Sequence, residues 1–152
     1  MGRKALSRIG IALISAAMLA FELTLTRLFS VAEWYHFAFL SVSVALLGYA
    51  ASGAILSLMS KRTCARLWPV AAVAFPLGIV GAYAVIDTVP FDSYQLAWAP
   101  VQILYLLVYY LGLVVPFLIA GWLVAYRLHS DPEHRNITYA ANLVGSAAGS
   151  LA

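Results

Sequence analysis

Charged residues are scarce in this chain of 152 residues, since Asp, Glu, Lys and Arg together make up 10% of it while hydrophobic types make up 64%. A water-soluble domain carries about 25% charged residues and has no means of hiding so much apolar surface. The composition therefore excludes an ordinary soluble enzyme or soluble binding module. It predicts a membrane protein instead, with lipid around most side chains.

Several patterns that mark a catalytic or cofactor site are also missing. Cys64 is the single cysteine, so neither a disulfide nor a cysteine-based metal site is predicted. The sequence has no phosphate-binding glycine loop, no metal-binding helix motif and no nucleophile elbow. The net charge of +3 comes from short basic clusters between apolar runs rather than from one basic helix face, which argues against nucleic acid as a partner. We expect no catalytic residues, no metal and no enzymatic activity in the chain itself.

Long apolar runs are what the sequence has in abundance. A helix rising about 1.5 Å per residue needs about 20 such residues to cross a hydrocarbon core of about 30 Å. Five runs are found, at about 9–31, 36–59, 67–86, 101–126 and 137–152. They predict an all-α, polytopic transmembrane bundle that forms a single membrane domain over 1–152. The fifth run ends without a polar flank, so we expect that span to be incomplete and the native chain to continue.

The positive charges predict an orientation for these spans. Eight of the nine Lys and Arg residues fall on one side of the predicted membrane, the side of the expected polar turn 60–66. Arg27 is the exception. Because cytoplasmic loops are enriched in Lys and Arg, we expect a multi-pass protein of a bacterial inner membrane with its N-terminus in the cytoplasm. The eight residues are Arg3, Lys4, Arg8, Lys61, Arg62, Arg66, Arg127 and Arg135.

Glu22 is the residue most in need of an explanation, because it lies inside the first predicted span, about 20 Å along the helix from Ile9. A carboxylate facing lipid at that depth is costly, so it must face protein, water or a partner. One interpretation is a proton or cation site assisted by Thr24, Thr26 and Arg27. The other is a buried polar contact that fixes helix packing. Arg27 follows by five residues and so does not lie squarely on the face of Glu22.

His36 is a candidate for a cofactor contact. The spacing Ala32-x-x-x-His36-x-x-x-Leu40 is similar to the pigment-ligating pattern of bacterial light-harvesting helices, which would make His36 a magnesium ligand of bacteriochlorophyll. The same loose pattern is common in apolar helices, where the histidine simply caps a helix or lies at the membrane interface. No cofactor is therefore predicted, and a bacteriochlorophyll contact is kept as an alternative.

Small residues indicate where helices approach one another closely. Packing rather than hydrophobicity drives helix association in lipid, and small residues let two backbones come near. We expect such contacts, with helices of this chain or of other subunits, at Gly48, Ser52 and Gly53 in the second span and at Gly145 and Gly149 in the fifth.

Four segments together carry a family resemblance. FELTLTRLFS at 21–30, WYHFAF at 34–39, LLGYAASG at 46–53 and YAANLVGSAAG at 139–149 resemble the N-terminal membrane region of bacterial spermidine synthase-like integral membrane proteins. In that family the membrane helices commonly precede a cytoplasmic aminopropyltransferase-like domain of Rossmann type, and this chain contains none of that domain. Where the family helix usually has an acidic residue, this sequence has Asn142. The resemblance implies Glu22, Arg27 and His36 as candidate functional positions and carries no enzymatic activity over.

These observations favour a membrane anchor or accessory subunit that packs against other transmembrane helices in a larger complex, such as a respiratory or photosynthetic one. The expected partners are the lipid bilayer and other helices. Two alternatives stay open. The first is a small-solute or proton transporter that uses Glu22 in a bundle opened by Pro76 and Pro116. The second is the truncated membrane part of an aminopropyltransferase-like enzyme.

Overall fold

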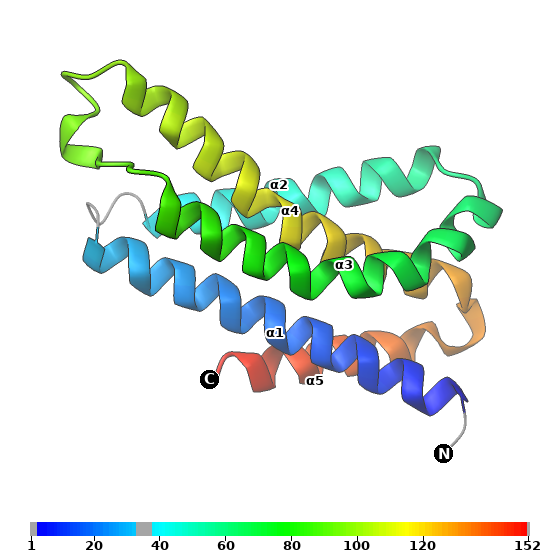
Figure 1. Ribbon diagram of the computed structural model, residues 1–152. Helices are drawn as coiled ribbons and strands as arrows, with labels where there is room; N and C mark the ends of the chain where they lie inside the picture. Colours follow the sequence, from blue (N-terminus) through cyan, green and yellow to red (C-terminus); the bar gives the residue numbers. More distant parts are fainter. Residues whose placement is uncertain (1–2, 33–37, 152) are drawn as a thin grey trace.

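The computed structural model describes residues 3–32 and 38–151, and within these ranges the chain is all-α, as predicted, without a strand (Figure 1). Two short 3₁₀ turns, η2 and η3, lie before α4 and between α4 and α5. The elements are α1 (Arg3–Ala32), α2 (Ala38–Leu58), α3 (Lys61–Thr88), η2 (Ser93–Gln95), α4 (Val101–Ser130), η3 (Pro132–His134) and α5 (Arg135–Gly149).

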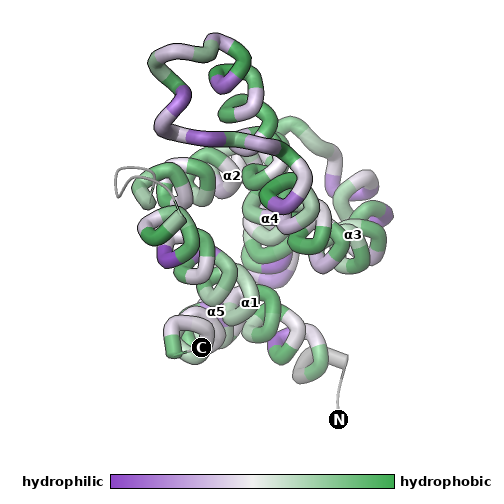
Figure 2. The backbone as a smooth tube through the Cα atoms, turned by 60° about the vertical axis from the view of Figure 1, so that its left-hand side comes forward, coloured by the Kyte–Doolittle hydropathy of each residue, from purple (hydrophilic) through white to green (hydrophobic). Residues whose placement is uncertain are grey.

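Four of these helices are long and apolar enough to cross a membrane, namely α1 from Leu6 onward, α2, α3 and α4. Hydrophobic residues predominate along the helices, whereas hydrophilic residues gather in the loop between α3 and α4 and near helix ends (Figure 2). Large side chains such as Leu46, Val73 and Leu77 are each about two-thirds exposed. So much exposed apolar surface suits lipid and not water, which makes the chain a multi-pass membrane protein.

The helices extend beyond the apolar runs that predicted them. The polar turn that was predicted at 60–66 is wrong, because α3 already begins at Lys61. Ser60 is its N-cap, and the Ser60 hydroxyl accepts a hydrogen bond from the backbone N–H of Thr63 at 3.2 Å. Hydropathy marks where hydrocarbon ends, whereas a capped helix continues through the headgroup region.

The five described helices lie roughly along one direction through the bundle, so each of its two ends can be defined by the residues there (Figure 1). At the basic end α1, α3 and α5 begin and α2 and α4 end (Figure 1). At the far end α3 is joined to α4 through the loop 89–100, where the Asp92 carboxylate caps η2 by accepting from the backbone N–H of Tyr94 at 2.9 Å. The basic end carries Arg8, Lys61, Arg62, Arg66, Arg127 and Arg135.

Helices α2 and α4 run in the same direction and cross at a contact to which each helix contributes a glycine. A Cβ added to Gly48 would lie 2.5 Å from the Cβ of Phe117 and 2.9 Å from the backbone nitrogen of Leu118. One turn further, a Cβ on Gly121 would lie 2.6 Å from the Ser52 hydroxyl oxygen. These two contacts bring the α2 and α4 backbones together around Phe117, which is fully buried in the core.

Helices α1 and α5 form a second parallel pair, with Gly145 and Gly149 of α5 set directly on Ala12 and Ala16 of α1. A Cβ at either glycine would overlap the backbone carbonyl group of the alanine it faces. Helix α5 is short and ends about halfway along α1 (Figure 1). Gly53, which the sequence placed among the packing glycines, differs from the others, because a Cβ there would meet nothing within 4 Å.

Candidate functional site

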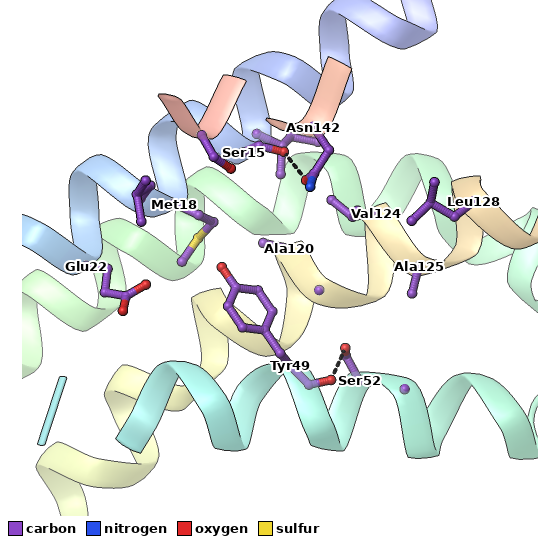
Figure 3. Close-up of a pocket in the computed structure, with 15 residues that line it drawn as sticks. Ser15, Met18, Glu22, Tyr49, Ser52, Ala120, Val124, Ala125, Leu128 and Asn142 are labelled. Carbon is purple, nitrogen blue, oxygen red and sulfur yellow. Dashed lines mark hydrogen bonds between the residues drawn. The ribbon is translucent and has the colours of Figure 1, made fainter. Parts of the chain in front are cut away.

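A cavity of about 450 Å³ lies among α1, α2, α4 and α5, within the apolar part of the bundle (Figure 3). Its wall on α4 is apolar, formed by residues such as Ala120, Val124 and Leu128. The other three helices contribute polar side chains, which are Ser15 and Glu22 from α1, Tyr49 and Ser52 from α2, and Asn142 and Ser146 from α5. Polar groups gathered at this depth in a membrane protein mark it as the candidate site.

Helical periodicity explains why these side chains face the same space. Residues three, four or seven positions apart lie on one face of a helix. Ser15 and Glu22 are seven positions apart on α1, Tyr49 and Ser52 three apart on α2, and Asn142 and Ser146 four apart on α5. The two parallel glycine contacts, α1 with α5 and α2 with α4, then hold these faces around a common space.

Glu22 is half-buried on α1, and its carboxylate points into the cavity (Figure 3). It lies about 24 Å along the helix from Leu6, the first residue of this span. Within the described part of the chain the carboxylate forms no hydrogen bond and no ion pair. An unpaired carboxylate this deep is costly unless it is protonated or meets a cation.

Tyr49 is the second polar group without a partner of its own. Its hydroxyl points from α2 across the cavity toward the stretch of α1 that carries Met18 and Glu22 (Figure 3). The ring stands edge-on to Phe117, with centroids 6.0 Å apart and an interplanar angle of 84°, and this contact fixes its direction. No described residue forms a hydrogen bond with this hydroxyl, which leaves it free to donate to, or accept from, a bound group.

The Ser15 and Ser52 hydroxyls of the cavity already form hydrogen bonds within the bundle. The Ser15 hydroxyl donates to the Oδ1 atom of Asn142 at 2.7 Å and so joins α1 to α5. The Ser52 hydroxyl donates to the Tyr49 backbone carbonyl at 2.7 Å. The cavity therefore offers one free acid and one free phenol, beside the Ser146 hydroxyl and the Asn142 amide nitrogen, which form no hydrogen bond with a described residue.

The residues that were expected to assist Glu22 are placed elsewhere. The Thr26 hydroxyl lies 2.6 Å from that of Ser41 and joins α1 to α2 beyond the cavity. The Thr24 hydroxyl donates to the Ala20 carbonyl at 2.7 Å and is exposed. Arg27 is exposed, does not line the cavity and forms no ion pair with Glu22 within the described residues. His36 lies outside the described residues.

The carboxylate and the phenol define the chemistry that this cavity supports. Together they can accept hydrogen bonds from a cationic or protonated solute, and the phenol can also donate one. The carboxylate can alternatively hold a proton. The residues that the structure describes contain no group of three His, Cys, Asp or Glu side chains placed to bind a metal ion.

Four residues of the cavity were not predicted from the sequence to belong to a site. They are Ser15, Tyr49, Asn142 and Ser146. Ser15 could have been found by stepping back two helical turns from Glu22. Asn142 was singled out only as a departure from a family pattern, although a polar amide in an apolar run also signals an internal contact. Tyr49 gave no such signal, because tyrosine is ordinary in a membrane helix.

No family model, curated protein or solved structure matches this chain. The resemblance to spermidine synthase-like membrane regions therefore stays a prediction, and the function has to be argued from the cavity.

Proposed function

We propose that the bundle is a small-solute or proton transporter whose binding site is the cavity at Glu22. The observation that carries this proposal is the Glu22 carboxylate, which faces a cavity of about 450 Å³ inside the membrane without a hydrogen-bond or ion-pair partner among the described residues. An ionisable group held at this depth is costly and is typically retained for a solute or a proton.

The shape of the cavity supports the same proposal. Its volume falls within the range of about 300–1,000 Å³ that is typical of small-molecule sites. The lining continues from Glu22 to Leu128, close to the last residue of α4, so the cavity extends toward the basic end. On the opposite side of Glu22, the hydroxyl contact of Thr26 with Ser41 joins α1 to α2. A solute would enter from the basic end and meet Glu22 at the inner end of its path.

Glu22→Gln is expected to lower transport at least about tenfold, because the amide keeps the shape of the side chain but neither binds a cation strongly nor carries a proton. Charge-assisted hydrogen bonds contribute about 1.5–3 kcal/mol, and about 1.4 kcal/mol corresponds to a factor of ten. The measurement is proton flux into liposomes that contain the purified full chain and a pH-sensitive dye, with an imposed pH gradient.

The matched control is Glu133→Gln, which removes the same charge from an exposed glutamate of η3. This variant should transport like the original chain. Equal flux through the original chain and Glu22→Gln, or flux no faster than in protein-free liposomes, would contradict transport of protons through this site. In the second case, the same liposomes loaded with a small amine test the solute form of the proposal.

A second candidate function, that of a structural or accessory subunit, is favoured by the open side of the cavity. Tyr49 is 40% exposed although it lines the cavity, and Gly53 beside it meets nothing within 4 Å of an added Cβ. We infer that a helix of another subunit, carrying a basic residue, could cover this side and pair with Glu22. Such a complex would purify in mild detergent with a stoichiometric partner, and Glu22→Gln would release that partner. A chain that purifies alone from its native membrane excludes this candidate.

We further propose that the basic end faces the cytoplasm of a bacterial inner membrane, since the described basic clusters lie at that end and Arg27 lies apart from them. With this orientation the cavity would fill from the cytoplasm. The same orientation would suit the membrane part of an aminopropyltransferase-like enzyme, which is the proposal that the family resemblance supports.

A further inference from the structure

A second hollow, which shares Ile14 with the lining of the Glu22 cavity, runs between α1 and α3 at the basic end and holds about 1000 Å³. We call it the α1–α3 groove. Its walls are mostly apolar, formed by Leu6 and Leu13 of α1 and by Trp68 and Phe75 of α3, and it ends on α4 at Tyr126 and Arg127. On α1 the lining reaches from Leu6 to Ala17, which is about 16 Å along the helix axis toward the middle of the membrane.

Among the residues that the structure describes, Arg127 is the one charged side chain in the wall of this groove. Its Nε–H donates to the Ser7 hydroxyl at 2.6 Å, which holds the guanidinium against α1. No Asp or Glu of the described ranges lines the groove, and Arg127 forms no ion pair with any residue in them. The four N–H groups on its two Nη atoms therefore remain available, in the planar arrangement that matches a phosphate.

From this combination we infer that the α1–α3 groove binds an anionic phospholipid, with its phosphate on Arg127 and its acyl chains between α1 and α3. The cation lies at headgroup depth, near the end of α4, and the apolar walls continue from it into the membrane. A free phosphate has no apolar part and would leave the long apolar wall without a contact. A neutral lipid or an apolar helix would leave the charge of Arg127 unmatched. Both properties are satisfied together by a lipid with a negatively charged headgroup.

Arg127→Gln tests the phosphate contact. The purified full chain is placed in mixed micelles of phosphatidylglycerol and phosphatidylcholine, and native mass spectrometry measures how much of each lipid stays bound. The original chain should retain phosphatidylglycerol preferentially, and Arg127→Gln should lower that retention about tenfold, as expected for the loss of a charge-assisted contact. The control is Arg62→Gln, which removes an exposed charge at the same end but outside the groove.

Gly10→Leu tests the apolar part of the groove without touching Arg127. Gly10 lines the groove, and a Cβ there meets nothing within 4 Å, so leucine would fill the space that we assign to an acyl chain. Lipid retention should fall several-fold while the fold is kept. Gly81→Leu is the control, because Gly81 also has open space around it and lies outside the groove. This variant decides the question if Arg127→Gln does not fold.

Any of four results would overturn the inference, and the first three concern lipid retention. They are equal retention of phosphatidylcholine and phosphatidylglycerol, an equal loss in Arg62→Gln and Arg127→Gln, and full lipid retention in Gly10→Leu. A protein dimer without bound lipid would likewise show that a helix, not a lipid, occupies the groove. None of these results depends on whether Glu22 transports a solute, so the two proposals fail separately.

Discussion

Gly48→Leu is expected to lower the free energy of unfolding by about 3 kcal/mol or more, the largest effect of any single substitution considered for this chain. Inserting atoms into a well-packed interface typically costs about 1–3 kcal/mol, and more where nothing can move aside. At Gly48 the first added atom would already lie 2.9 Å from the backbone nitrogen of Leu118 and 3.0 Å from the carbonyl carbon of Phe117. Backbone atoms in the middle of α4 cannot yield unless the two helices separate.

The measurement is unfolding of the detergent-solubilised chain by increasing sodium dodecyl sulfate, followed by the loss of helical circular dichroism. Gly53→Leu is the control, because Gly53 lies on the same helix and has open space around it. Gly48→Ala should fall between the two, since its single added carbon meets the Cβ of Phe117 at 2.5 Å. Equal stability of Gly48→Leu and Gly53→Leu would show that α2 and α4 do not pack as described.

The second large effect is expected for Gly145→Leu, which should detach α5 from α1. An added Cβ would overlap the Ala12 carbonyl group and lie 2.7 Å from the Ala12 Cα atom. Helix α5 has its main packing on α1, so the loss of this contact frees most of the helix. Asn142 and Ser146 would leave with α5, and the Glu22 cavity would lose one of its walls.

A cysteine pair reports this detachment directly. Ser15 and Asn142 face each other across the helix pair, with Oγ and Oδ1 2.7 Å apart, and we expect Ser15→Cys with Asn142→Cys to form a disulfide in a Cys64→Ala background. Adding Gly145→Leu should slow that disulfide at least about tenfold, since about 1.4 kcal/mol of lost packing suffices for a factor of ten. Adding Gly81→Leu should leave it unchanged. Rapid disulfide formation with leucine at position 145 would refute the close contact of Gly145 with Ala12.

The sequence predicted the helices because lipid imposes a simple length and composition on a span. It did not predict where helices begin, as Ser60 and Lys61 illustrate. Hydropathy detects the hydrocarbon layer, whereas the helix start depends on whether a side chain such as that of Ser60 caps the backbone. The turn predicted at 60–66 therefore overlaps the first residues of α3.

The candidate site was only partly predictable for a related reason. Glu22 stands out in any sequence, because its cost in lipid depends on depth alone. Tyr49 and Asn142 acquire their roles through contacts between segments far apart in the chain, and those contacts depend on which glycines pack. Gly48 and Gly53 look alike in the sequence, yet Gly48 packs on Phe117 and Gly53 faces open space. The face that each helix turns inward is decided by the whole bundle.

The lengths of the helices have a consequence for the surrounding bilayer. The described part of α2 has 21 residues, about 32 Å of rise, which is enough to cross a hydrocarbon layer of about 30 Å. Helix α4 has 30 residues, about 45 Å, and must tilt or protrude to share that layer. Since α2 and α4 are locked together at Gly48 and Gly121, neither can adjust its tilt alone. The extra length of α4 therefore protrudes at its ends, into the headgroup layers that border the hydrocarbon.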